Sequence, residues 1–381
     1  MFPIHAPQRA DLEATVRFSA FLTTRSSGPD EDRRITQALV DHAVDVERLG
    51  FDAVFLPDHH FTGYCPPASD PMMFASFLAA RLPRLHYGFS VQTIALHHPV
   101  RFAERLNLLD QLTDGKLLVG TGSGTTPEEM IGLGINFKDT PELSKSHLAL
   151  VRQLWDKKAE DAPFVFDNGH YKGAVVSRIV PAAHTQGGPQ LMSVALRPSS
   201  VERAAAEAQP AFIPAFTPPA LDDGEPLKHL RTHFTAYRTA LEAAGHPQEK
   251  VARALDWTTH TYQHVHVAET DEQAEEEFQL LMAQYQAAIE REHEANLEAE
   301  KLSGVALNPP PNALTPGWQK TWCVWGSPAT VAEHLHEVSE IGIGNVLGGF
   351  LGGPLTPERA EYGKKSLELF ATEVMPTFRT N

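Results

Sequence analysis

The sequence is poor in cysteine, in long apolar runs and in clusters of basic residues. Among its 381 residues only Cys65 and Cys323 are cysteines, so no disulfide framework holds the fold and a reducing compartment is expected. No apolar run approaches the roughly 20 residues that a membrane-spanning helix needs. The N-terminal stretch MFPIHAPQRADLEAT lacks the hydrophobic segment of a signal peptide. These absences predict a cytoplasmic protein that needs no membrane.

The charge balance narrows the class of partner. The chain carries 32 Lys and Arg against 48 Asp and Glu, a net charge of −16. Nucleic-acid binding depends on clustered cations that neutralise phosphates. No such cluster interrupts the acidity, so nucleic acid is not expected as a partner. The 42% of hydrophobic residues is enough to build a large core.

Short apolar segments alternate with amphipathic helical segments along the whole chain. Strand patterns occupy 16–22, 51–56, 85–96, 116–120, 191–196, 211–216, part of 252–267, and 345–351. Eight strand–helix units in series predict a single α/β domain over residues 1–381, a closed parallel (β/α)8 TIM barrel. A doubly wound open sheet is the alternative.

Two segments interrupt the repeat. Residues 159–190 are rich in loop-forming residues and predict an excursion after the fourth helix. Residues 290–320, between the seventh and eighth predicted strands, are polar and then proline-rich. So long an insertion without regular structure is expected to be a lid or a disordered connection.

Polar residues gather where the second predicted strand ends. Asp58, His59 and His60 follow it directly, and the active site of a (β/α)8 barrel lies at the carboxyl ends of the strands. At least one of these side chains is therefore expected at the mouth. A metal site is not expected, because His59 and His60 have no HxxxH or HxH partner at their strand end, and no carboxylate stands at ligand spacing with His264 and His266. Taken singly, His59 is better explained as a hydrogen-bonded core or rim histidine than as a base.

An anion site is predicted after the fifth strand. Ser199 and Ser200 precede VERAA, where a helix is expected to begin, and free N–H groups at a helix N-terminus favour a phosphate. Arg197 could grip the same phosphate with both guanidinium nitrogens, although a surface ion pair explains it equally well. The TGSG turn after the fourth strand would let a ring or phosphate approach Ser123 and Gly124. It lacks the spacing of a phosphate-binding loop or dinucleotide fingerprint.

Longer stretches carry a family resemblance. The chain contains FDAVFLPDHHFTGY, HHPVRFAERLNLLDQLTDGKLLVGTGSG, VPAAHTQGGP and, near its end, GIGNVLGGF and EVMPTF. Together these resemble bacterial luciferase and the luciferase-like flavin monooxygenases, in register from about residue 16 to 378. The resemblance implies a (β/α)8 barrel that takes reduced FMN from a separate flavin reductase. With O2 such enzymes form a flavin hydroperoxide, which oxygenates an organic substrate.

The resemblance also implies a catalytic base. The catalytic α subunit of luciferase has Glu-His-His-Phe where this chain has Asp58 to Phe61, and the related β subunit has Asn in place of the first histidine. The α subunit also has a long loop between the seventh and eighth strands, which matches residues 290–320. This match makes His59 the general base, with Asp58 or His60 fixing its tautomer. It favours a catalytic chain over a non-catalytic flavin-binding subunit.

The same match implies a site for the FMN phosphate. The luciferase α subunit has an arginine near the phosphate where this chain has Ser123, and a serine where it has Arg197. The resemblance thus implies that the cation for the phosphate stands on the loop after the fifth strand in this chain, rather than on the loop after the fourth strand. Ser199 and Ser200 match hydroxyls that help to bind the phosphate, and Ala195 is counted with them as a cofactor residue.

The flavin ring is expected at the next two strand ends. A non-proline cis peptide bond under the ring would fall at Ser90-Val91. Gly122 replaces a reactive cysteine of luciferase, which would open space beside the flavin. The stretch that bears a tryptophan in the luciferase aldehyde pocket is PAFIPAFT here, so a different substrate is expected. A hydrophobic or aromatic substrate is favoured by aromatic residues near strand ends, namely Phe89, Phe212, Phe216, Trp257 and Phe350.

Two further expectations concern the reaction and the assembly. The strongest alternative among enzymes is a deazaflavin-dependent oxidoreductase, which shares this fold and transfers hydride without O2. Family members are usually dimers through their second and third helices. The small and apolar residues of PMMFASFLAA would allow close helix packing there, so a homodimer is predicted.

Overall fold

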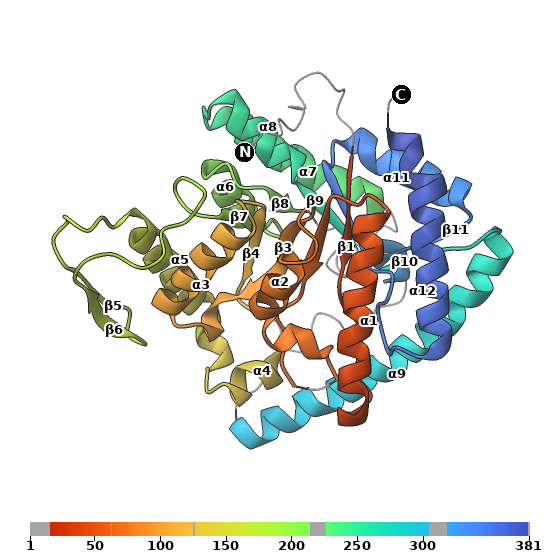
Figure 1. Cartoon of the computed structure of the whole chain (residues 1–381), viewed down its shortest axis with the longest axis horizontal. Coiled ribbons are helices and arrows are strands. Elements are labelled where there is room, and N and C mark those ends of the chain that lie inside the picture. The colour runs from red at the N-terminus through yellow and green to blue at the C-terminus, as the bar shows by residue number, and fades with distance from the viewer. Residues whose placement is uncertain (1–15, 62, 125, 214–225, 305–317, 380–381) are drawn as a thin grey trace.

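Eight parallel strands close into a barrel, with helices packed around its outside (Figure 1). The computed structural model describes residues 16–61, 63–124, 126–213, 226–304 and 318–379. The order around the barrel is β1-β12-β9-β8-β7-β4-β3-β2. These strands are β1 (Arg17–Phe21), β2 (Ala53–Leu56), β3 (His86–Thr93), β4 (Leu117–Gly122), β7 (Gln190–Val194), β8 (Ala211–Phe212), β9 (Thr259–Tyr262) and β12 (Asn345–Gly348). The predicted (β/α)8 barrel is confirmed, and the open-sheet alternative is wrong.

Most of the helices begin at or next to a proline, whose fixed φ suits the first helical turn and whose missing N–H is no loss there. They are α1 (Pro29–Arg48), α2 (Pro71–Ala79), α3 (Pro99–Leu112), α4 (Pro127–Gly132), α5 (Thr140–Asp156), α6 (Pro198–Ala206), α7 (Pro226–Ala243), α8 (Gln248–Asp256), α9 (Asp271–Ser303), α10 (Gln319–Trp322), α11 (Pro328–Ile341) and α12 (Pro357–Leu369). Across the described ranges no helix combines the length and the apolar character needed to cross a bilayer.

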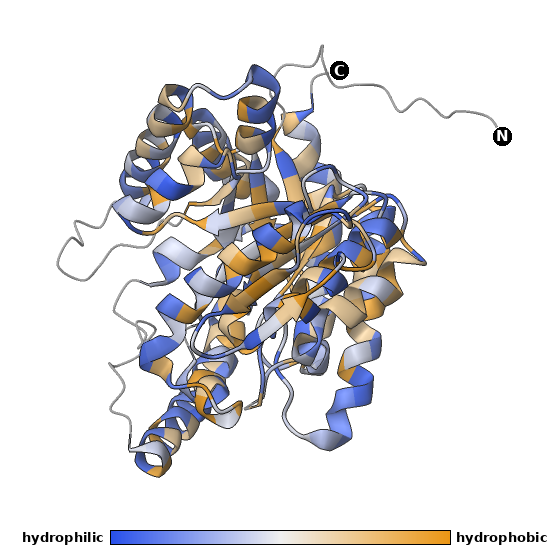
Figure 2. Cartoon of the chain, turned by 90° about the vertical axis from the view of Figure 1, so that its left-hand side faces the viewer, coloured by the Kyte–Doolittle hydropathy of each residue, from blue (hydrophilic) through white to orange (hydrophobic). Residues whose placement is uncertain are grey.

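The core has two layers. A small apolar cluster that includes Phe55, Leu118, Met192 and Phe212 fills the inside of the barrel, and a larger one lies between the strands and the helices. Figure 2 shows the central strands as the most hydrophobic part of the molecule. A side chain at Gly88 would collide with the Phe55 ring, so a glycine is needed there.

The seventh strand differs from its prediction. β9 ends at Tyr262, and after Gln263 the chain enters β10 (His264–Val267), which lies outside the barrel and pairs in parallel with β11 (Cys323–Gly326). The seventh barrel strand predicted within 252–267 is β9, but His264 and His266, which were expected on that strand, do not lie on a barrel strand. The pattern THTYQHVHV alternates without a visible break. The strand that pairs with β10 is β11, which lies far along the chain, so local sequence does not reveal where β9 ends.

The two interruptions of the repeat contain regular structure. The excursion at 159–190 carries the antiparallel hairpin of β5 (Phe164–Asp167) and β6 (Lys172–Val175), which projects from the barrel in Figure 1. Between β9 and β12 the chain forms β10, α9, α10, β11 and α11. The expectation of an irregular segment over 290–320 is wrong for 290–303, which is the second half of α9. Residues 305–317 lie outside the described residues.

Candidate active site

The predicted site residues lie along one row of neighbouring strand ends. β2, β3, β4 and β7 are adjacent in that order, and they pair in parallel close to their carboxyl ends. Around the mouth the row therefore begins with His59 after β2 and continues through Ser90 and Val91 in β3 to Gly122 in β4. It ends after β7, where Arg197 leads into α6. The sequence thus placed a base at one end of the row and a phosphate site at the other.

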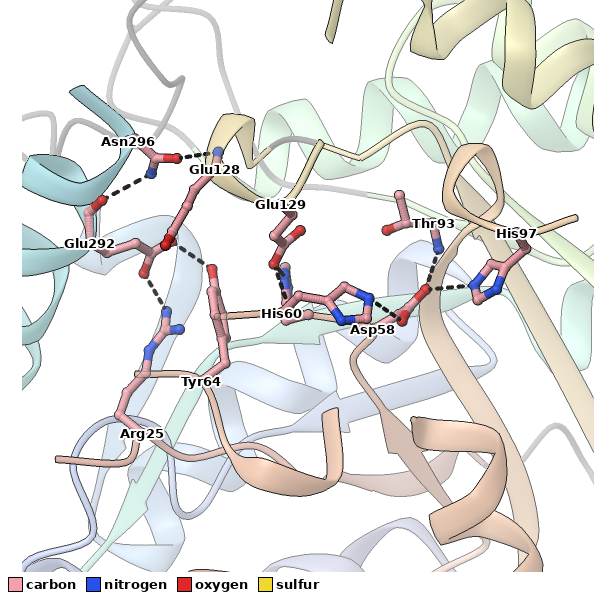
Figure 3. A network of polar contacts seen from close by, with 11 residues as sticks. Arg25, Asp58, His60, Tyr64, Thr93, His97, Glu128, Glu129, Glu292 and Asn296 are labelled. Carbon is pink, nitrogen blue, oxygen red and sulfur yellow. Dashed lines mark hydrogen bonds and ion pairs between the residues drawn. The ribbon is translucent and has the colours of Figure 1, made fainter. Parts of the chain in front are cut away.

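A buried carboxylate orients His59. Glu129, in the first turn of α4, is only 1% exposed, and its Oε1 lies 2.8 Å from Nδ1 of His59. The same oxygen accepts a hydrogen bond from the backbone N–H of His60 at 2.9 Å (Figure 3). With Nδ1–H donating to the carboxylate, Nε2 is left as the proton acceptor. The prediction that Asp58 or His60 fixes this tautomer is wrong, because Glu129 does so.

Asp58 contacts a different histidine, His97. Its Oδ2 accepts from the backbone N–H of Thr93 at 2.8 Å and lies 3.1 Å from Nε2 of His97 (Figure 3), while Nε2 of His60 lies 3.6 Å from Oδ1. Burial alone would raise the pKa of Asp58, but the bonds from His97 and Thr93 outweigh it and hold that pKa below its usual value. Asp58 is therefore ionised, and its hydrogen bonds link the end of β2 to the end of β3. Sequence reasoning missed His97.

One face of the His59 ring packs on a tyrosine. The imidazole stacks on the Tyr64 ring with 4.0 Å between centroids and 8° between planes, and Cζ of Arg25 lies 3.8 Å from the centroid of the same phenol ring. The Tyr64 hydroxyl donates to Oε1 of Glu292 at 2.6 Å, and Nη2 of Arg25 lies 3.0 Å from Oε2 of Glu292 (Figure 3). Burial raises the pKa of Tyr64, so the phenol stays neutral and remains a donor.

A pocket of about 770 Å³ opens beside His59. Its lining mixes polar and apolar groups and comes from the loop after β1, the start of α1, the loop after β2, and α9; it includes Ser26, Ser27, Asp32, Phe61, Tyr64 and Arg291. Phe61 has a φ of 63°, a rare conformation for a residue with a bulky side chain. Its ring is 50% exposed. Such backbone strain is typical of a site that must present a particular side chain.

Of the two features expected at the ends of β3 and β4, one is present and one is not. The Ser90-Val91 peptide bond is cis, as the resemblance implied. A Cβ added at Gly122 would lie 2.6 Å from Cγ2 of Val91, so the Val91 side chain fills the space that Gly122 was expected to open. That expectation is wrong. Ser123 is partly exposed and follows β4 directly.

The start of α6 fits a phosphate. The helix begins at Pro198, with Arg197 as its N-cap residue, so Ser199 and Ser200 lie in the first turn rather than before it. The Ser200 hydroxyl donates to the carbonyl of Arg197 at 2.8 Å and accepts from its N–H at 2.9 Å. Arg197 is exposed. Ala195 is fully buried, and its N–H donates to the carbonyl of Phe212 at 3.0 Å.

The aromatic residues expected at the mouth are mostly elsewhere. Phe89 and Phe350 belong to the outer core layer, and Trp257 lies just before β9, with Cζ of Arg17 4.6 Å from its ring centroid. Trp257 is therefore at the opposite end of the barrel, where β1 and β9 begin. Phe212 lies inside the barrel, and Phe216 lies outside the described residues. These positions remove the sequence argument for an apolar mouth.

Within the residues that the structure describes, no group of three or more His, Cys, Asp or Glu side chains could hold a metal ion. Of the two carboxylate–histidine pairs, Glu129 with His59 has the arrangement of an oriented base, whereas Asp58 with His97 joins two strand ends.

Comparisons with known proteins identify relatives. A family model described as luciferase-like monooxygenase matches residues 16–345. The alkanal monooxygenase alpha chain of Photorhabdus luminescens is 28% identical over 198 residues, which cover 52% of this chain and 53% of that protein. The chain thus spans about half the length of this relative.

Two solved structures share the fold. Monooxygenase RslO1 from Streptomyces bottropensis has a TM-score of 0.74 and 21% identity, covering 96% of this chain and 100% of that one. The oxygenating constituent of 3,6-diketocamphane monooxygenase from Pseudomonas putida, solved with FMN, has a TM-score of 0.69 and 18% identity, covering 96% and 98%. At these identities the likeness shows the fold alone.

Proposed function

The chain belongs to the family of luciferase-like monooxygenases, and from that premise we propose that it is an FMNH2-dependent monooxygenase that oxygenates an organic substrate. The observation that carries the proposal is the row of strand ends, with a carboxylate-oriented histidine at one end and an exposed cation at a helix N-terminus at the other. Reduced FMN, once bound, would supply the electrons that O2 needs to transfer one oxygen atom.

The residues present fit FMN along this row. Arg197 and the first-turn residues Ser199 and Ser200 would hold the phosphate, because an exposed guanidinium and the N-terminal end of a helix both favour an anion. Ser90 and Val91 in β3 and Gly122 in β4 would lie against the flavin ring. Ser123 would lie beside it.

His59 would act as the base. Its Nδ1 faces Glu129, so Nε2 can take a proton from the substrate or from the reacting centre. The pocket beside His59 would receive the substrate, with Phe61 offering an apolar surface and Arg291 and the serines offering polar contacts. Asp58, His60 and His97 would hold the loop that carries the base, so Asp58 and His60 have a positioning role in this proposal.

The partners follow from the same premise. A separate flavin reductase would supply FMNH2. A second copy of the chain would pack on α2 and α3, where four large apolar side chains are exposed: Met73, Phe77, Leu108 and Leu112. Cys65 and Cys323 are buried free thiols, which suits the reducing cytoplasm as the place of action.

The test is rapid mixing of the anaerobic protein, loaded with FMNH2, with oxygenated buffer while absorbance is followed. A transient species distinct from oxidised flavin, living longer than in free solution, is expected. His59→Ala should still form it but should yield little oxygenated product. If oxidised FMN appeared at the free-solution rate, the monooxygenase proposal would fail and the deazaflavin-dependent alternative would be tested next.

A further inference from the structure

Helix α9 contributes a side chain to the support of His59. Figure 3 shows Glu292 on α9 facing Tyr64 and Arg25, which lie on loops at the barrel mouth. We propose that Glu292 is a positioning residue: through Tyr64 and Arg25 it fixes the surface on which the His59 imidazole rests. The inference rests on the function proposed above, since that function makes His59 the base.

The contacts form a continuous chain from the helix to the base. Glu292 accepts a hydrogen bond from the Tyr64 hydroxyl with one carboxylate oxygen and faces Arg25 with the other. Arg25 covers the Tyr64 ring at 3.8 Å, and His59 stacks on that ring at 4.0 Å. The phenol ring is thus held by its hydroxyl and by a cation, and a shift of the ring would move the imidazole that rests on it.

Burial makes these contacts strong. The Arg25 and Glu292 side chains are 13% and 16% exposed, and an ion pair with so little water around it is screened weakly. Burial alone would lower the pKa of Arg25, but Tyr64 and Glu292 outweigh it and raise that pKa. Loss of the Glu292 charge would leave a buried cation without its partner, which costs more than the loss of an exposed pair.

The next turn of α9 reaches the other support of His59. Asn296 accepts from the backbone N–H of Glu128 at 3.0 Å and donates to the carbonyl of Glu292 at 3.0 Å (Figure 3). Glu128 precedes Glu129, the carboxylate that orients His59. One stretch of α9 therefore touches both the stacked tyrosine and the helix that carries the orienting carboxylate.

Two variants and one control test the inference. Glu292→Gln removes the charge but keeps an acceptor for the Tyr64 hydroxyl, and Tyr64→Phe keeps the aromatic stack but cuts its bond to α9. Glu294→Gln removes the same charge from an exposed position on the same helix. In both test variants kcat should fall about tenfold while KM stays within about twofold. The control should match the unmodified protein.

The second measurement needs neither flavin nor substrate. Stacking at 4.0 Å shifts the ring proton resonances of His59 through the ring current of Tyr64. In the cofactor-free protein, labelled at histidine and assigned by His59→Gln, these resonances should move toward the unstacked position in both test variants. The control should leave them in place.

The outcomes separate the two proposals. Unmoved His59 resonances in Tyr64→Phe, or a kcat unchanged in both test variants of an active enzyme, would overturn the positioning role. If the unmodified chain oxygenates no substrate, the proposed function fails, yet the resonance shifts still decide whether Glu292 positions His59. If Glu292→Gln does not fold, Tyr64→Phe decides alone, because it keeps the Arg25 ion pair.

Discussion

The nitrogen of His59 that carries a proton is decided by Glu129. Glu129→Gln should lower kcat for substrate oxidation by about a hundredfold, because an amide can turn its N–H toward Nδ1 and favour the wrong tautomer. FMN binding should stay within about twofold, since Glu129 lies at the base end of the row. Steady-state kinetics and FMN fluorescence titration measure the two effects.

The matched control for Glu129→Gln is Glu142→Gln. Glu142 lies at the start of the neighbouring helix α5, and its side chain is 84% exposed. It should leave both kcat and FMN affinity unchanged. Equal losses in the two variants would mean that the charge itself, rather than its contact with His59, matters, and would remove Glu129 from the site.

Asp58 should contribute more to stability than to chemistry. Its pKa is lowered in the folded state, so its stabilising effect is complete above the pKa of an unfolded aspartate and is lost as pH falls through the folded value. Asp58→Asn should lower the free energy of unfolding by about 2 kcal/mol at pH 7. The difference in the free energy of unfolding between Asp58→Asn and the unmodified chain should narrow below about pH 4. Urea unfolding at both pH values measures it, and a gap that widens in acid would contradict the role.

The sequence revealed only part of this site. The positions of His59 and Arg197 at strand ends could be predicted, because both residues stand inside recognisable stretches. Glu129 could not, because a glutamate in the first turn of a helix is ordinarily explained by the helix dipole. His97 and Glu292 act through contacts between segments far apart in the chain, which local spacing does not reveal.

At the scale of elements, α6 should bind the phosphate through Arg197 at its first turn. Arg197→Ala should weaken FMN binding about tenfold or more, and Arg197→Lys should recover only part of the loss, because an ammonium cannot bond in the bidentate way. Arg203→Ala, near the other end of α6, is the control. Fluorescence titration with FMN measures all three. Equal affinities for Arg197→Ala and the control would place the phosphate elsewhere.

The elements that were predicted correctly are those whose pattern is local. Strands such as β2 and helices such as α3 follow from apolar spacing. The break between β9 and β10 depends on pairing with β11, and tertiary pairing overrides a strand pattern. The second half of α9 was missed because EREHEANLEAEKL is polar on nearly every side. It is held as a helix at the mouth by contacts of Glu292 and Asn296.

At the scale of the whole molecule, the exposed apolar side chains on α2 and α3 call for a partner. Met73 is 69% exposed and Phe77 44% on α2, while Leu108 is 51% and Leu112 55% exposed on α3. The two helices pack against each other, and we infer that these side chains form one surface. Covering it removes apolar area from water, which is favourable at roughly 25 cal/mol per Å². Two copies meeting through this surface would bury it symmetrically.

The homodimer is tested by light scattering coupled to gel filtration. The unmodified chain should elute as one species near twice its 41.9 kDa mass. Met73→Glu with Leu108→Glu should give the monomer mass, because two buried like charges would face their own copies across the symmetry axis. Val165→Glu, on the projecting hairpin, is the control, since Val165 is 70% exposed but lies away from α2. A single symmetric peak at monomer mass for the unmodified chain would remove the dimer. Dissociation by the hairpin variant alone would move the interface to β5 and β6.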